Sequence, residues 1–197
     1  MKQVPGDLMT QKILVILAHP VPASYCGALA NAYAEGAGEA RAEVRRLVLA
    51  ELSFDPVRAG PGPVETDIVH AQDAIRWAEH LVFVYPIMWG TIPALLKGFI
   101  ERAFVPGFAV DFPKGSRLWS RLLKGRSARL IVTMNSAPVI YRWVFGGPAH
   151  RTMKRAILGI CGVSPVRITE IGPMRTASKE RREAWLEAVR RVGRALA

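Results

Sequence analysis

The sequence predicts an α/β protein with a doubly wound, five-stranded parallel sheet and helices on both faces. Short apolar runs alternate with amphipathic stretches of helix length along the chain, and this alternation is typical of βαβ units. The apolar runs, such as KILVILA at 12–18, lack an every-second-residue pattern. Such runs indicate strands that are covered on both faces, as in parallel sheets.

Each predicted strand is one of these apolar or β-branched runs. In order, we expect strands over 12–18, 44–49, 81–85, 128–134 and 165–171. The segments between them, 105–127 and 135–147, are too long for ordinary connections and are predicted to be two long loops. Loops of that length on a rigid sheet usually carry function.

Each predicted helix has a start signal or a helical apolar period. Ser24 and Ser178 are suitable N-caps, Pro93 suits a first turn, and Ile68 begins an apolar stripe at helical spacing in the second helix. The helices are expected over 24–39, 64–79, 92–104, 148–161 and 178–196.

The composition indicates one soluble domain. The chain has 197 residues, half of them hydrophobic, so we expect a single domain over 1–197 with a loose tail at 1–10. No apolar run is long enough for a membrane span, and the N-terminus lacks the apolar centre of a signal peptide. Two cysteines make neither a disulfide framework nor a zinc motif, so we predict no metal site and a cytoplasmic location.

Positive charge is concentrated in the second half of the chain. The net charge is +11, and residues 101–197 carry a net +13. No nucleic-acid motif accompanies it, so a solvated surface is favoured over a nucleic-acid partner. A run of basic residues could alternatively contact a nucleotide phosphate; it comprises Lys114, Arg117, Arg121, Lys124, Arg126 and Arg129.

Three polar segments follow predicted strands and should meet at the carboxyl edge of the sheet. After the first strand, Ser24 at a helix start suits a phosphate, and His19 could donate to it. After the third strand, Trp89 offers a flat surface beside the backbone amides around Gly90. A phosphate at one end and a polar-edged ring at the other describe FMN, or the FMN half of FAD. In the alternative, His19 and Ser24 only cap the loop and the helix, and Trp89 only packs in the core.

The chain resembles the flavodoxin-like NAD(P)H:quinone oxidoreductase family. The resemblance lies in AHPVPASYCGAL (18–29), YPIMWGTIPALLKGFIERAFVPGFAV (85–110), TMNSAPVIYRWVFGGPAHR (133–151) and CGVSPVR (161–167). The second segment is the most specific, because it joins a ring-binding loop to its helix at fixed spacing. In this family the first loop holds the flavin phosphate through side chains and helix amides, so a glycine-rich loop is not needed.

The resemblance implies a set of site residues. The flavin phosphate would meet His19, Ser24, Tyr25 and Cys26, and the ring would be lined by Pro86, Ile87, Met88, Trp89 and Gly90 and closed by Thr133, Asn135 and Ser136. Tyr141 matches a family tyrosine that sits over the ring, and we expect it to be a catalytic hydrogen-bond donor. Two departures stand out. Asn135 and Ser136 replace glycines or an aspartate, and Gly147 replaces a histidine, which leaves His150 as the nearest candidate for a proton relay.

The resemblance also implies an activity. NAD(P)H would reduce the bound FMN or FAD by hydride, and a quinone, nitro or azo compound would then take two electrons. The enzyme would be a homodimer in which Phe108 and Phe112 reach the partner's pocket. The alternatives are a flavodoxin-type electron carrier and a regulatory flavoprotein subunit of a membrane transporter.

Overall fold

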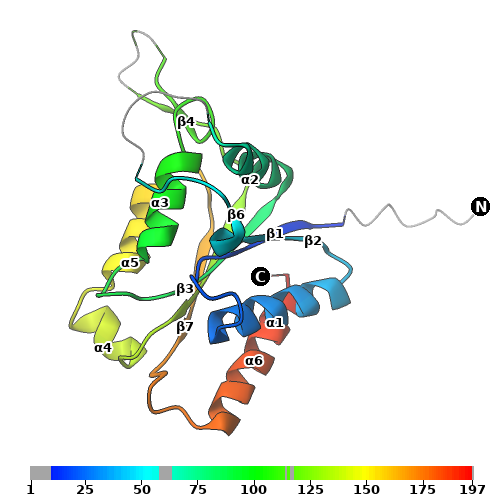
Figure 1. The fold of residues 1–197 in the computed structure, drawn as a ribbon, viewed down its shortest axis with the longest axis vertical. Helices are drawn as coiled ribbons and strands as arrows, with labels where there is room; N and C mark the ends of the chain where they lie inside the picture. Colours follow the sequence, from blue (N-terminus) through cyan, green and yellow to red (C-terminus); the bar gives the residue numbers. More distant parts are fainter. Residues whose placement is uncertain (1–9, 58–63, 114, 116–117, 197) are drawn as a thin grey trace, which may run out of the picture.

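The structure is a computed structural model that describes residues 10–57, 64–113, 115 and 118–196. The predicted tail at 1–10 lies outside the described residues, apart from its last residue. The central sheet is parallel and has the order β2-β1-β3-β6-β7 (Figure 1). Its strands are β1 (Lys12–Leu17), β2 (Glu43–Val48), β3 (His80–Pro86), β6 (Ser127–Thr133) and β7 (Val166–Ile171). The predicted α/β fold class and its five parallel strands are confirmed.

Helices cover both faces of this sheet (Figure 1). On one face lie α1 (Tyr25–Glu39) and α6 (Lys179–Arg194), and on the other lie α2 (Thr66–Trp77), α3 (Ala94–Ala103), α5 (Pro148–Arg151) and the π-helical turns η2 (Thr152–Gly159) that continue α5. The short 3₁₀ turn η1 (Leu49–Glu51) follows β2. Ser24 and Ser178 cap α1 and α6 as predicted, since their hydroxyls accept from Gly27 N and Arg181 N.

The strands alternate their apolar side chains between two cores. Leu14, Ile16 and Phe83 pack under α2 and α3, whereas Val15 and Val82 pack under α1 and α6. This division explains the unbroken apolar runs in the sequence, because all but one side chain of each central strand, β1, β3 and β6, is buried. None of the helices in the described part of the chain has the length and apolar character needed to cross a bilayer.

The two predicted long loops contain secondary structure. Segment 135–147 holds α4 (Pro138–Trp143), and segment 105–127 holds the short antiparallel pair β4 (Val110–Asp111) and β5 (Ser120–Arg121). The loop predictions were therefore wrong for these residues. The proline at the start of α4, Pro138, is a sequence signal for a helix start, because its fixed φ suits a first helical turn.

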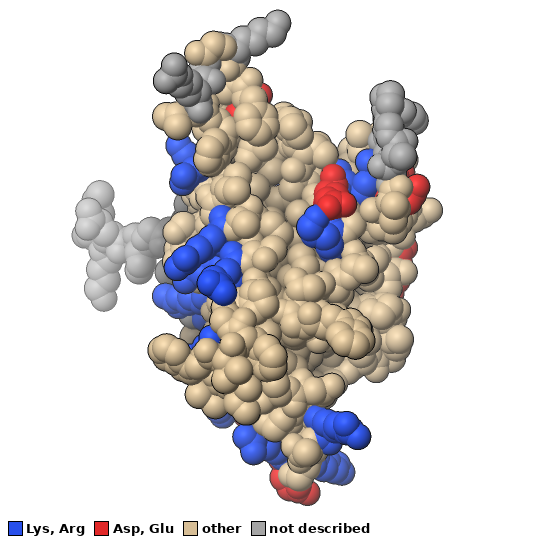
Figure 2. All heavy atoms as spheres, turned by 90° about the vertical axis from the view of Figure 1, so that its left-hand side faces the viewer, with Lys and Arg blue, Asp and Glu red and all other residues tan. Residues whose placement is uncertain are grey.

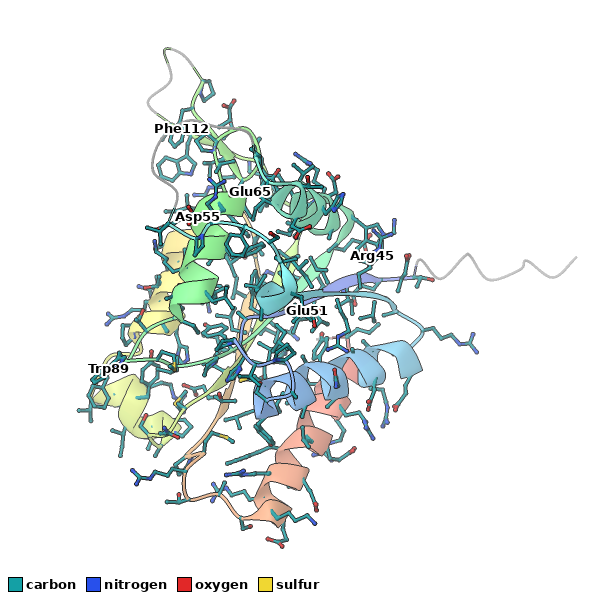
Figure 3. The ribbon with its side chains drawn as sticks, in the orientation of Figure 1. Arg45, Glu51, Asp55, Glu65, Trp89 and Phe112 are labelled. Carbon is teal, nitrogen blue, oxygen red and sulfur yellow. The ribbon has the colours of Figure 1, made fainter. Side chains whose placement is uncertain are left out.

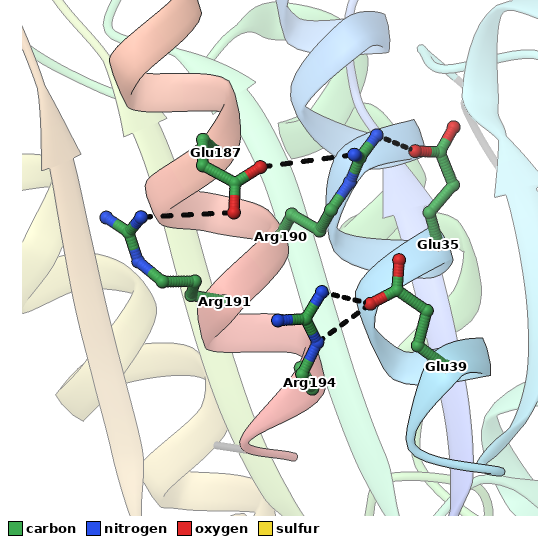
Figure 4. A network of polar contacts seen from close by, with 6 residues as sticks. All are labelled: Glu35, Glu39, Glu187, Arg190, Arg191 and Arg194. Carbon is green, nitrogen blue, oxygen red and sulfur yellow. Dashed lines mark hydrogen bonds and ion pairs between the residues drawn. The ribbon is translucent and has the colours of Figure 1, made fainter.

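Glycines allow α1 and α6 to cross closely. A Cβ on Gly36 would come 2.0 Å from the Arg190 carbonyl oxygen, and one on Gly193 would come 2.2 Å from that of Tyr33. Around this crossing, Arg190, Arg191 and Arg194 of α6 form ion pairs with glutamates (Figure 4). Glu35 and Glu39 belong to α1, and Glu187 belongs to α6. These pairs are exposed, so packing at the two glycines contributes more to holding the helices together.

The basic run does not form one solvated face. Arg126 donates to the carbonyl oxygens of Ile75 (3.1 Å) and Arg76 (2.7 Å) at the end of α2, where a cation stabilises the helix dipole. Arg129 is buried and donates to Thr169 Oγ1 at 2.6 Å. The expectation of a solvated face was wrong for these two residues, and Lys114 and Arg117 lie outside the described residues.

Candidate functional site

The order of the strands places the site. β1 lies between β2 and β3, so the chain leaves β1 toward one side and returns to build the rest of the sheet on the other. Segments that follow β1 and β3 therefore diverge at the carboxyl edge and leave a crevice between them. The segment after β6, the strand beside β3, borders the same crevice.

The loop after β1 is folded tightly against the start of α1. A Cβ on Gly27 would lie 1.9 Å from the Pro22 carbonyl oxygen, so only glycine allows the loop to approach this closely. His19 Nδ1 lies 2.9 Å from Val21 O and 3.0 Å from Val21 N, which fixes the imidazole in the loop. Nε2 is the ring nitrogen left for a ligand.

The first turn of α1 presents backbone amides. The Ser24 hydroxyl accepts from Gly27 N at 3.3 Å. The amides of Tyr25 and Cys26, the first two residues of the helix, have no acceptor within the helix. Such amides, at the positive end of the helix dipole, bind anions.

The segment after β3 forms a tight turn whose tip is Trp89 and Gly90. Met88 N donates to Thr91 O at 3.0 Å and Thr91 N donates to Met88 O at 2.9 Å. Trp89 and Gly90 between them have φ values of +50° and +76°. Two successive positive φ values are those of a type I′ turn, in which a tryptophan is strained. The Trp89 side chain is fully exposed and projects from the turn (Figure 3).

Two clefts meet at Trp89. The larger, of about 780 Å³, is lined by apolar side chains with His19, Thr91, Lys97 and Thr152 among them. The smaller, of about 480 Å³, shares Trp89 with it; its lining comprises Ile87, Trp89, Gly90, Met134, Asn135, Ser136, Tyr141 and Phe145. The structure thus brings most of the predicted site residues together around one turn. Both volumes are in the usual range for small-molecule sites.

Sequence reasoning missed several lining residues. The larger cleft includes Pro20, Leu95, Lys97 and Thr152, and the smaller includes Phe145. Phe145 lies in segment 133–151, which was already assigned to the site from the sequence, so it could have been predicted as a lining residue. Thr152 comes from the helix that packs beside α3, and only the tertiary structure brings it there.

Three predicted phosphate or ring-edge side chains point elsewhere. The Tyr25 hydroxyl donates to Arg182 O at 2.7 Å, so it ties α1 to α6. Cys26 and Thr133 are both buried, and Cys26 Sγ lies 3.4 Å from Thr133 Oγ1. Burial raises the pKa of Cys26 to about 11, so the thiol is neutral. These side chains therefore do not face a ligand, because α1 directs those of Tyr25 and Cys26 inward and Thr133, at the end of β6, is buried against Cys26. At Tyr25 and Cys26 only the backbone amides remain for a ligand.

Tyr141 is buried under the turn, with 1% of its surface exposed. Its hydroxyl donates to Gly90 O at 2.8 Å and accepts from Ala149 N at 2.9 Å. Its ring borders the smaller cleft, as the sequence predicted, but its proton is already committed to the backbone. The expected role as a free donor above the ring is not compatible with this arrangement.

His150 is also buried and lines neither cleft. Its Nδ1 lies 3.5 Å from Glu170 Oε1, and its ring stands edge-on to Tyr141 with centroids 5.0 Å apart. Burial, with the nearby Arg142 charge, lowers the pKa of His150, so the imidazole is neutral at neutral pH. Burial raises the pKa of Glu170, while Arg142, whose Nε is 3.1 Å from Glu170 Oε2, opposes that shift. His150 is therefore placed to support Tyr141 rather than to contact a ligand.

An apolar surface surrounds the open side of the clefts. Trp143, Val144 and Phe145 on and after α4 are more than half exposed, as are Met88 and Trp89. Figure 2 shows that this side of the molecule is mostly uncharged, with Lys and Arg in separate patches. A monomer rarely exposes so much contiguous apolar surface unless it binds a partner or ligand.

The two phenylalanines expected near a partner's pocket differ. Phe108 is buried in its own core, where its ring lies edge-on to Phe104, so that expectation was wrong for Phe108. Phe112 is 64% exposed. It lies near β4, far from Trp89 (Figure 3), so it is not part of this chain's own clefts.

The donors along this edge of the sheet fit a flavin. A flavin carries a phosphate and a flat ring with polar edges. The free amides of α1 suit the phosphate, and the amides of Trp89 and Gly90, at the tip of the turn, suit the ring edge. In the described part of the chain, no group of three His, Cys, Asp or Glu side chains is placed to hold a metal ion.

Comparison with known proteins gives the family. A family model described as a flavodoxin-like fold matches residues 11–196. The chain belongs to this flavodoxin-like family. Among solved structures, a protein from Streptococcus mutans, Smu.1420, is 30% identical with a TM-score of 0.82, covering 94% of this chain and all of that one.

Relatives of this flavodoxin-like protein bear names of redox enzymes. An uncharacterized NAD(P)H oxidoreductase of Haemophilus influenzae is 28% identical over 88% of this chain and 90% of its own. The human ribosyldihydronicotinamide dehydrogenase [quinone] is 28% identical, over 66% of each chain. An NAD(P)H:quinone oxidoreductase from Methanothermobacter marburgensis, 23% identical with a TM-score of 0.81, covers 95% of this chain and all of its own and shares the fold.

Proposed function

We propose that this protein is a flavin-dependent NAD(P)H oxidoreductase that passes two electrons to a quinone or azo acceptor. The observation that carries the proposal is the pair of clefts that share the Trp89 turn at the switch point of a flavodoxin-like sheet. The names of the relatives support it.

The flavin, FMN or FAD, would lie across the carboxyl edge of β1, β3 and β6. Its phosphate would meet the amides of Tyr25 and Cys26, the Ser24 hydroxyl and His19 Nε2. Its ring would occupy the smaller cleft, between the turn at Trp89 and Gly90 and the polar segment Asn135–Ser136. Flavin chemistry would supply the hydride acceptor and donor.

The chain's own contribution is binding and orientation. The backbone amides of Trp89 and Gly90 would stabilise negative charge at the edge of a bound ring, because their positions are fixed in advance. The apolar lining of the larger cleft would hold the nicotinamide and then the acceptor beside the ring, and would exclude water. The Tyr141 hydroxyl donates to Gly90 O and His150 is buried outside both clefts, so neither side chain is placed to supply the proton that the reduced acceptor needs.

The active unit would be a homodimer. The exposed apolar residues around α4 and Trp89 border the clefts, so a second copy packed there would cover both the surface and the open side of the site. Phe112 of the partner subunit is a candidate wall for the site, since it is exposed and lies away from its own clefts.

Two measurements test the proposal. Purified protein should be yellow, and denaturation followed by chromatography should release FMN or FAD without a covalent link. Steady-state oxidation of NAD(P)H in the presence of a quinone separates an enzyme from an electron carrier or a regulatory subunit. Protein that cannot be reconstituted with either flavin would overturn the proposal.

A further inference from the structure

The turn whose Trp89 lines both clefts is strained and needs external support. Hydrogen bonds between Met88 and Thr91 close it, and Trp89 at its tip has a φ of +50°. A positive φ is unfavourable for tryptophan, and a residue keeps such a conformation only where several surrounding contacts enforce it. The Trp89 side chain is fully exposed, so its own packing does not hold the turn in this conformation.

The Tyr141 hydroxyl supplies that support. A phenol has a single proton, and Tyr141 donates it to Gly90 O at 2.8 Å, inside the turn. The same oxygen accepts from Ala149 N at 2.9 Å, at the start of α5. The hydroxyl therefore joins the turn after β3 to a helix that packs against the body of the protein. Burial raises the pKa of Tyr141, so the proton is retained.

We propose that Tyr141 is a positioning residue whose buried hydroxyl fixes the Trp89–Gly90 turn, and that it is not a proton donor to the acceptor. Donation to a ligand would require Tyr141 to release Gly90 O. That carbonyl would then lose its hydrogen bond, and the hydrogen-bonded link through Tyr141 between the turn and α5 would be broken. The edge-on contact with His150 holds the phenol ring in the required direction. The part of this inference that concerns flavin rests on the proposed function.

Amide hydrogen exchange on protein without flavin tests the tether directly. Tyr141→Phe keeps the ring and removes the two hydrogen bonds, so the amides of Met88 and Thr91 should exchange about three- to tenfold faster. The matched control is Tyr85→Phe. Tyr85 is also buried, and its hydroxyl has no hydrogen-bond partner among the described residues, so its removal should leave these amides at the parent rate. Unchanged exchange in Tyr141→Phe would overturn the proposal, whether or not the protein binds flavin.

Rapid-mixing kinetics then distinguish positioning from proton donation. If Tyr141 is a positioning residue, Tyr141→Phe should have a higher flavin Kd than the parent. Both half-reactions, reduction by NAD(P)H and reoxidation by quinone, should then be slower by a similar factor. If Tyr141 instead donates a proton to the acceptor, Tyr141→Phe should slow only the reoxidation by quinone and leave the flavin Kd unchanged. The second pattern would refute the assigned role. Failure of the parent protein to bind flavin would instead count against the proposed function, because the exchange result stands without it.

Discussion

Replacing Gly27 by alanine should damage the flavin site through the backbone. The new Cβ would come 1.9 Å from the Pro22 carbonyl oxygen, and ordinary contact requires the two to separate by more than about 1 Å. The obstacle is backbone rather than a flexible side chain, so the loop that carries His19 must move away from the start of α1. Overpacking of this kind typically costs about 1–3 kcal/mol of stability.

The same movement displaces the groups that would hold the phosphate. Misplacement by about 1 Å can lower binding or rate by up to about 100-fold, and we expect the flavin Kd of Gly27→Ala to rise about tenfold or more. The Kd is measured by quenching of flavin fluorescence on titration with apoprotein. The free energy of unfolding is measured by urea denaturation in the absence of flavin.

Two other glycines of α1 provide controls. A Cβ on Gly38 would meet no atom of the described residues within 4 Å, so Gly38→Ala should gain up to about 1 kcal/mol from helix propensity and leave flavin binding unchanged. Gly36→Ala meets the Arg190 carbonyl oxygen at 2.0 Å, so it should lose stability with little change in the flavin Kd of the folded protein. If Gly27→Ala binds flavin as tightly as Gly38→Ala, the reasoning about the loop is wrong.

Three further predictions concern charge, pH and assembly. Ser24→Asp should weaken flavin binding, because it adds a negative charge beside the phosphate; tighter binding would argue against a phosphate at this helix start. Burial, with the Arg129 and Arg167 charges, lowers the pKa of His80 from 6.5 to about 4. The folded state therefore binds that proton more weakly than the unfolded state, and stability should fall by up to about 3 kcal/mol as pH drops from 6.5 to 4. Urea denaturation across this range should show a flatter dependence in His80→Gln, and an equal slope would exclude His80 as the cause. Trp143→Asp should give a monomer with little activity by light scattering and NAD(P)H oxidation, whereas Val69→Asp on α2 should remain dimeric; an active Trp143→Asp monomer would contradict the homodimer.

The fold was predictable because its signals are local. Strands buried on both faces read as unbroken apolar runs, and Ser24, Ser178 and Pro93 mark helix starts through capping and φ preferences that operate within one turn. The elements that were not predicted, α4 and the β4–β5 pair within the two long loops, are short. Their stability comes from packing rather than from a repeated apolar period, so the sequence carries little signal for them.

The position of the site was also available from the sequence, because carboxyl ends of parallel strands must meet at one edge. What each side chain does there was not. Tyr25, Cys26 and Thr133 lie in the right segments, yet their polar atoms bond inward to α6 or to each other. The proton of Tyr141 is taken by Gly90 O, which is far away in sequence. A residue's place on the sheet edge follows from its own strand, but the direction of its polar group is decided by which partner the other elements bring within hydrogen-bond distance, and only the tertiary structure sets that.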